Sequence, residues 1–159
     1  MFTNRSELLK ANPMQASYGV AVTDVNGDGY FEFFVAGFGY PNQVLRWDGG
    51  GYVDIAPTIL ADLMRQAIGV AAGDIDGDGR EEIYVLNTDT FAGDKRFADR
   101  LFAFGEGWVD LFSLPQNREA LNLTAGRSVA CVDRNGDGRY GFFVANYGGP
   151  MRLYELDDD

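Results

Sequence analysis

The sequence predicts an all-β fold made of three four-stranded antiparallel repeats. One loop occurs three times, as DVNGDGYFE at 24–32, DIDGDGREE at 74–82 and DRNGDGRYG at 133–141. Apolar, β-branched and aromatic runs flank each copy, and such runs favour strands over helices. The loops begin 50 and 59 residues apart, a spacing typical of the blades of a β-propeller. We therefore expect one domain over residues 1–159, with repeats at about 17–56, 68–113 and 126–156.

The first repeat contains four segments with strand character. Residues 19–23 lead into the loop, residues 31–36 leave it, and residues 43–47 and 52–55 follow. The sequence DGGG at 48–51 separates the last two segments, and such turn residues favour a β-hairpin. These segments predict a single antiparallel meander.

The second repeat has the same order of segments. Its strands are expected at 69–72, 82–87, 100–104 and 108–112. The insertion at 88–99 is expected to be an exposed loop, because it is longer than the matching turn of the first repeat. The connections that follow the fourth strands, 57–66 and 116–121, are expected to form short helical turns.

The third repeat supplies only three strands, at 128–132, 142–146 and 151–156. The amino-terminal segment MFTNRSELLKANP is similar to the fourth strands of the other repeats with their connections, YVDIAPTILADL and WVDLFSLPQNREAL. We therefore expect residues 1–12, through a strand near 2–5, to complete the third blade. Propellers use this offset closure to join the first blade to the last.

The repeated loops have the donor pattern of a hard-cation site. Oxygen-bearing side chains occupy positions 1, 3 and 5, glycine occupies 4 and 6, and the carbonyl of position 7 and an acid at 9 complete the set. An EF-hand is excluded because position 12 is Val35, Val85 or Val144 instead of Glu. Ordinary Asp-Gly turns that merely join strands are the weaker alternative. Isolated turns of this kind are common, but three loops with the same alternation of oxygen donors are not. The predicted ligands are Asp24, Asn26, Asp28, Tyr30 and Glu32, then Asp74, Asp76, Asp78, Arg80 and Glu82, then Asp133, Asn135, Asp137 and Arg139.

Ligands made only of oxygen indicate calcium rather than zinc or copper, and the chain has no His and one Cys. We expect two well-formed Ca²⁺ sites and a weaker third, because Gly141 takes the place of the position-9 acid in the third loop. Carboxylate counts predict that affinity falls from the second loop to the first and then to the third. The metal is expected to be structural, since it fixes the turn between two strands of each blade.

The loops between two strands resemble the FG-GAP or VCBS calcium repeat of the integrin α-chain propeller. The runs YGVAVTDVNGDGYFEFFVAG, IGVAAGDIDGDGREEIYVLNT and AGRSVACVDRNGDGRYGFFVANY further resemble the amino-terminal blades of the cartilage acidic protein family. This resemblance covers about residues 18–147 and implies a calcium-stabilised propeller with an extracellular role in adhesion or ligand binding. Gly141 departs from the family pattern, as do Glu32 and Glu82 where many such repeats have Asp.

Composition limits the possible partners. The net charge is −11, from 24 acidic and 13 basic residues, which opposes binding to nucleic acid or insertion into an anionic membrane. No apolar run reaches the length of a membrane span, and the first residues do not form a signal peptide. Calcium sites of modest affinity suit calcium-rich surroundings, so we expect an extracellular or cell-surface protein in mature or excised form.

Two smaller features complete the sequence. Cys131 lies in the apolar run SVACV, which predicts a buried thiol. Asn4-Arg5-Ser6 and Asn122-Leu123-Thr124 are N-glycosylation sequons, which matter only if the chain passes through a glycosylating pathway.

Three blades are fewer than the four to eight or so that normally close a propeller. We therefore expect either a homo-oligomer or polymer or a piece of a longer propeller chain, and the sequence leaves ring, filament and monomer open. It favours a calcium-binding module that binds an extracellular protein or glycan. The alternative is a self-assembling structural subunit joined head to tail by strand exchange. An enzyme is disfavoured, because the chain has no His and no nucleophile, phosphate or zinc motif.

Overall fold

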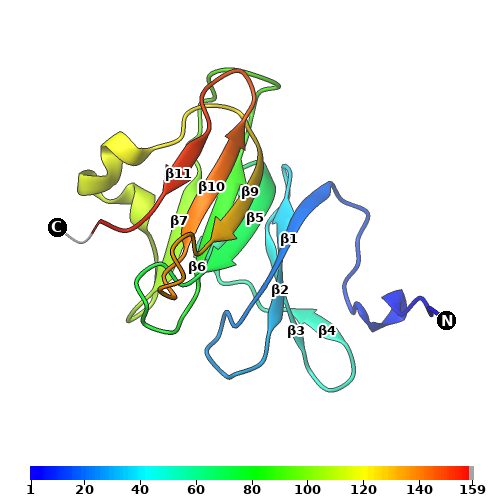
Figure 1. Ribbon diagram of the computed structural model, residues 1–159. Coiled ribbons are helices and arrows are strands. Elements are labelled where there is room, and N and C mark those ends of the chain that lie inside the picture. The colour runs from blue at the N-terminus through cyan, green and yellow to red at the C-terminus, as the bar shows by residue number, and fades with distance from the viewer. Residues whose placement is uncertain (158–159) are drawn as a thin grey trace.

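The computed structural model describes residues 1–157, and three antiparallel sheets make up most of it (Figure 1). Each predicted repeat forms one sheet whose strands follow in chain order, so the all-β fold in propeller-type blades is confirmed. The first sheet contains β1 (Ser17–Thr23), β2 (Glu32–Gly37), β3 (Gln43–Trp47) and β4 (Tyr52–Asp54). The second contains β5 (Ala67–Gly73), β6 (Glu82–Asn87), β7 (Arg100–Phe104) and β8 (Trp108–Asp110), and the third contains β9 (Gly126–Val132), β10 (Gly141–Asn146) and β11 (Arg152–Tyr154).

Side chains at the turns set the strand boundaries. Asp48 Oδ1 accepts hydrogen bonds from the backbone N–H groups of Gly50 and Gly51, both at 2.9 Å, and so closes the predicted hairpin between β3 and β4. β8 ends two residues earlier than predicted, because the carboxylate of Asp110 accepts a bond from the N–H of Phe112. That bond starts a 3₁₀ turn, η2 (Leu111–Ser113), in place of further strand.

The three sheets stand side by side in chain order, with the first strands β1, β5 and β9 in contact. Gly19 of β1 lies so close to β5 that a Cβ on it would be 2.7 Å from the Cα of Gly69. One apolar core fills the space between the first two sheets, and a second core fills the space between the last two. Their largest fully buried residues include Phe34, Phe102 and Leu60 in the first core and Tyr84, Phe142 and Leu86 in the second.

The amino-terminal segment does not complete the third sheet within this chain. Residues 2–5 form no strand, and η1 (Ser6–Leu8) follows them. Leu9 then forms a parallel bridge with Tyr52 of β4, and the N–H of Lys10 donates to the Tyr52 carbonyl at 3.0 Å. The sheets form an open row, so the amino terminus lies at the opposite end from β11 (Figure 1). Within residues 1–157 the third sheet therefore has three strands, and the predicted closure is corrected.

The insertion at 88–99 is only partly exposed, which corrects the prediction of a solvent loop. Phe91 is exposed, but Lys95 and Asp99 are buried and form an ion pair. Asp99 also accepts hydrogen bonds from the hydroxyl of Tyr84 and from Asn122 Nδ2, both at 2.7 Å. The buried pair, with its neutral donors, anchors the insertion between the second and third sheets.

The connections contain short helices, as predicted. α1 (Thr58–Ala61) follows β4, and η3 (Pro115–Ala120) follows η2. Leu60 of α1 is fully buried in the first core, so this turn covers the sheet edge. Among the described residues, no helix has both the length and the apolar character needed to cross a membrane.

Candidate metal centre

Each repeated loop is closed by the aspartate at its first position. In the second loop, Asp74 Oδ1 accepts from the backbone N–H of Gly77 at 2.7 Å, and Oδ2 accepts from that of Gly79 at 2.9 Å. Gly77 and Gly79 have φ values of 80° and 88°, a region that glycine enters without steric cost. Asp24 and Asp133 make the matching bonds in their own loops. The three loops therefore share one hydrogen-bonded conformation.

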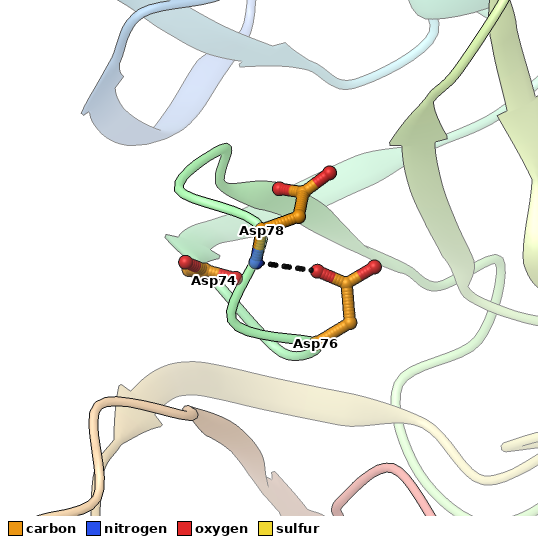
Figure 2. Close-up of side chains that lie close together, drawn as sticks. All are labelled: Asp74, Asp76 and Asp78. Carbon is orange, nitrogen blue, oxygen red and sulfur yellow. Dashed lines mark hydrogen bonds between the residues drawn. The ribbon is translucent and has the colours of Figure 1, made fainter.

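Three aspartates converge in the second loop (Figure 2). Side-chain oxygens of Asp74, Asp76 and Asp78 lie within 4.8 Å of one another. Asp76 Oδ1 accepts from the N–H of Asp78 at 3.0 Å, the bond that is dashed in Figure 2. Asp74 is half-buried and the other two are exposed, so solvent and ions reach the cluster. Carboxylates at this separation repel one another unless a cation or proton is shared, so the triad can hold a metal ion.

The first and third loops carry an amide where the second has Asp76. Asn26 Oδ1 accepts from the N–H of Asp28 at 2.9 Å, as Asp76 does from Asp78. Asn135 instead donates from Nδ2 to Asp137 Oδ2 at 2.8 Å. The acidic triad is thus specific to the second loop among the described residues, and the other two loops have less negative charge to offer a cation.

The position-9 acids are buried beneath their loops. Glu32 is fully buried and Glu82 is 3% exposed. Glu82 Oε2 accepts from the N–H of Ile75 at 2.9 Å, and Glu32 Oε2 accepts from the N–H of Val25 at the same distance. Each acid therefore ties the second strand of its blade to the start of the loop.

Burial changes the acidity of both glutamates. Desolvation, with smaller contributions from the nearby charges of Asp76, Asp78 and Asp74, raises the pKa of Glu82 to about 7, although the Ile75 hydrogen bond lowers it. Desolvation likewise raises the pKa of Glu32, with smaller contributions from Asp28 and Asp24. A bound cation would remove this penalty, because it favours the ionised carboxylate.

The third loop has no room for a position-9 acid. A Cβ on Gly141 would lie 2.6 Å from the backbone oxygen of Tyr154, because β11 passes directly over it. The same Cβ would lie 2.9 Å from Cγ of Glu155, so the Glu155 side chain occupies the space that Glu32 and Glu82 fill in their loops. Glu155 forms an ion pair with Arg134, at the second position of the third loop. The sequence did not indicate that Glu155 belongs to this loop, because only the pairing of β10 with β11 brings it close.

Neighbouring loops touch through the residue at position 7. A Cβ on Gly27 would lie 2.7 Å from Arg80 Nη2, so the Arg80 guanidinium rests on the first loop. Arg80 also lies over the ring of Phe104, 4.3 Å from its centroid. In the same way, Arg139 lies against Gly77 of the second loop. The three loops are therefore arranged along one end of the row of sheets.

The predicted side chains of each loop lie near one another, but their hydrogen-bond partners differ. The aspartates and asparagines at positions 1, 3 and 5 lie together, whereas Glu32 and Glu82 bond to the backbone below. The carbonyls of Tyr30, Arg80 and Arg139 stay predicted ligands. Their N–H groups donate to the position-5 carboxylates of Asp28, Asp78 and Asp137.

The fold and the loops together define a class of protein. Residues 24–85 match the family model of the FG-GAP-like repeat, a segment that runs from the first loop through the second. The resemblance to the FG-GAP repeat that the sequence predicted is therefore confirmed for this segment.

Over most of its length, the chain is similar to cartilage acidic protein 1. It is 51% identical to the protein of Xenopus tropicalis over 93% of the chain. It is 49% identical to the human protein and 48% identical to the mouse protein, each over 94% of the chain. It spans about a quarter of the length of these relatives, 25% to 26%.

Proposed function

We propose that this chain is a calcium-binding, propeller-type module in which the metal is structural. The observation that carries the proposal is the second loop, where Asp74, Asp76 and Asp78 bring carboxylate oxygens within 4.8 Å of one another. Oxygen donors around a tight glycine-rich loop suit calcium, which takes several carboxylate and carbonyl ligands. Ionisation of the buried Glu82 next to this triad would be supported by the same cation.

Calcium affinity should follow the number of carboxylates in reach. The second loop offers four, the first offers three because of Asn26, and the third offers Asp133 and Asp137 from its own residues. Glu155 is the acid best placed to supplement the third loop, since it fills the position-9 space. Its present partner, Arg134, would have to release it. The third site is therefore proposed to be the weakest.

Asp78→Ala tests the proposal. At calcium about a hundred times the dissociation constant, one site stabilises the fold by about 2.7 kcal/mol. We expect the variant to lose most of that gain, so the rise in melting temperature on adding calcium shrinks by several degrees relative to the wild type. Thermal denaturation with and without calcium is the measurement, and isothermal titration calorimetry should show one high-affinity site fewer.

Asp94→Ala is the matched control, because Asp94 is an exposed aspartate of the insertion, outside the loops. It should keep the full response to calcium. An unchanged melting response in Asp78→Ala would refute a calcium site in the second loop.

We further propose an extracellular role in binding a protein or glycan. A hollow of about 460 Å³ lies where β1, β5 and β9 begin, on the side away from the calcium loops. Its lining includes the aromatic rings of Tyr18, Phe38 and Phe91 and the guanidinium of Arg127. Rings next to polar donors suit a sugar or a peptide side chain. The similarity to cartilage acidic protein 1 supports an extracellular setting for such binding.

Catalysis is not part of the proposed function. The acids of the loops are used by backbone hydrogen bonds and by the proposed cations. Tyr84, which is fully buried, donates to Asp99 within the core. A binding module accounts for these groups without assigning a reacting one.

A further inference from the structure

Two of the three repeated loops place an asparagine directly before a glycine, at Asn26-Gly27 and Asn135-Gly136. Such a pair can lose the side-chain amide without an enzyme, because glycine has no Cβ to shield its backbone nitrogen from the preceding side chain. The second loop has Asp76 at this position and no amide to lose. Both asparagines are exposed, and both glycines have positive φ, of 74° and 76°.

The backbone of the two loops does not distinguish the two sites. The N–H of Gly27 donates to Asp24 Oδ1 and the N–H of Gly136 donates to Asp133 Oδ1, each at 2.7 Å. This restraint on the glycine nitrogen is the same in both loops. A difference in reactivity must therefore come from the groups that hold each asparagine side chain.

The fold holds Asn26 at both ends of its amide. Its Oδ1 accepts a hydrogen bond from the backbone N–H of Asp28 at 2.9 Å, and its Nδ2 donates to Glu32 Oε1 at 3.1 Å. Glu32 is fully buried, and its other carboxylate oxygen is bonded to the N–H of Val25. The position-9 acid is therefore a fixed anchor, and the Asn26 side chain cannot turn toward Gly27 without breaking both of its bonds.

The third loop lacks this anchor, because its position 9 is Gly141. Among the described residues, the amide of Asn135 has a single hydrogen-bond partner, Asp137 Oδ2 at 2.8 Å. Asp137 is exposed and belongs to the same loop. An exposed bond of this kind has a small net free energy, because water replaces it when it breaks. Rotation of the Asn135 side chain toward Gly136 is therefore less restrained than the same movement of Asn26.

We propose that Asn135 is a site of spontaneous deamidation in the folded protein, and that Glu32 protects Asn26 from the same reaction. The backbone nitrogen of Gly136 forms a bond to Cγ of Asn135, its proton passes to solvent, and the amide nitrogen leaves as ammonia. Water then opens the cyclic imide at either carbonyl, which leaves aspartate or isoaspartate at position 135. One water is consumed, one ammonia is released and the loop gains one negative charge.

The aspartate product makes the third loop similar to the second. It adds a carboxylate between Asp133 and Asp137, where the second loop has Asp76 between Asp74 and Asp78. Because the loops share one hydrogen-bonded conformation, the product would complete an acidic triad of the kind found in the second loop. This consequence rests on the proposed calcium function, whereas the deamidation itself does not.

Peptide mapping by mass spectrometry tests the modification. The wild type is incubated in calcium-free, mildly alkaline buffer, at a temperature where circular dichroism shows it folded, and in parallel in guanidinium chloride. In the unfolded chain both asparagines should convert at similar rates, because each precedes glycine. In the folded chain the acid form should accumulate several-fold faster at position 135 than at position 26.

Two variants assign the reaction to these residues. Asn135→Gln disfavours the cyclic imide, so it should remove most of the acidic species that isoelectric focusing detects in the aged wild type. Glu32→Ala removes the anchor of Asn26, so position 26 should then convert at a rate close to that of position 135, with circular dichroism to confirm the fold. Equal conversion of both positions in the folded wild type would overturn the proposal. So would a folded chain that keeps both amides while the unfolded chain loses them.

Asn135→Asp tests the consequence separately. Isothermal titration calorimetry should show tighter calcium binding at the third loop in this variant than in the wild type, because a third carboxylate faces the cation. An unchanged titration would overturn the proposed gain in affinity, and the mass-spectrometric result would still decide whether Asn135 is modified.

Discussion

At the residue scale, the buried acids are the least expected feature of this protein. Glu32 and Glu82 read in the sequence as ordinary members of an oxygen-rich loop, yet both lie below it, out of contact with solvent. Asp99 and Lys95 form a buried ion pair. Its hydrogen-bond partners are Tyr84, Asn122 and the carbonyl of Asn87. Burial of a charge is tolerated only with such partners, so these residues fix the geometry around them.

The same network bears on glycosylation. Asn122 is fully buried and donates from Nδ2 to both Asp99 and Asn146. Attachment of a glycan to this nitrogen would break the network, so the folded chain cannot accept one there. Asn4 is exposed, so its sequon is accessible in the fold.

The raised pKa of Glu82 predicts a pH dependence of the metal-free protein. Below pH 4.5 the carboxyl is protonated in both folded and unfolded chains, whereas between 4.5 and about 7 only the folded chain keeps the proton. The folded chain then binds more protons, so stability falls as pH rises through this window, by up to about 3 kcal/mol. Chemical denaturation in a chelator at pH 5 and pH 7.5 measures the effect.

Glu82→Gln tests whether Glu82, and not another acid, causes this pH dependence of stability. The amide resembles the protonated carboxyl, so the variant should lose most of the pH dependence in chelator while the exposed-site control Glu106→Gln keeps it. Excess calcium should flatten the wild-type profile, because it favours the ionised form. A wild type that gains stability between pH 5 and 7.5 in chelator would contradict the assignment.

At the element scale, close approach of the first strands holds neighbouring blades together. β1 and β5 meet at Gly19 and Gly69, and a Cβ on Gly19 would clash with the backbone of Gly69 and Val70. The packing of β1 on β5 requires glycine at position 19. The hydrophobic periodicity of β1 does not predict this requirement. Gly126 is similarly constrained, since a Cβ there would lie 2.2 Å from Leu86 Cδ1.

Gly19→Ala should therefore separate the first two blades. Its new methyl group would meet the backbone of Gly69 and Val70, which cannot rotate away. We expect a destabilisation of about 2 kcal/mol, within the range for overpacked cores. Urea denaturation measures it, with Gly105→Ala as control, because nothing lies within 4 Å of a Cβ at Gly105. Equal stability of the two variants would show that the blades are not in close contact here.

At the scale of the whole molecule, the second sheet is the best-buried part of the row of sheets. Every residue of β6 is buried, because the second sheet has a neighbour on each face. β4 and β11 are short outer strands of the first and third sheets. Local opening should therefore be easiest at the ends of the row.

Hydrogen exchange should report this gradient. Amides of β5 and β6 should exchange slowest, and those of β4 and β11 fastest, because only full unfolding exposes the second sheet. Slower exchange in β10 than in β6 would contradict the ranking.

The repeats, their order and the character of the loops follow from the amino-acid sequence alone. Periodic strands, the spacing of aspartates and glycines, and the Asp48 hairpin are local features, so they can be read without knowing what lies beside them. Most strand bounds and the two short helices in the connections were predicted in this way. The half-buried Cys131 was predicted only in part, because it faces the second core from the margin of the third sheet.

The contacts between blades, in contrast, depend on the three-dimensional packing of the sheets. This packing placed Glu155 in the space above Gly141, buried Lys95 and Asp99 in a segment that reads as a polar loop, and left residues 2–5 far from the third sheet. The reason is physical: these contacts join residues distant in the chain, and their free energy depends on the packing of whole sheets. The different exposure of Tyr84 and Phe143, which hold matching positions in their blades, has the same origin, because exposure is decided by what stands next to a sheet and not by the strand's own sequence.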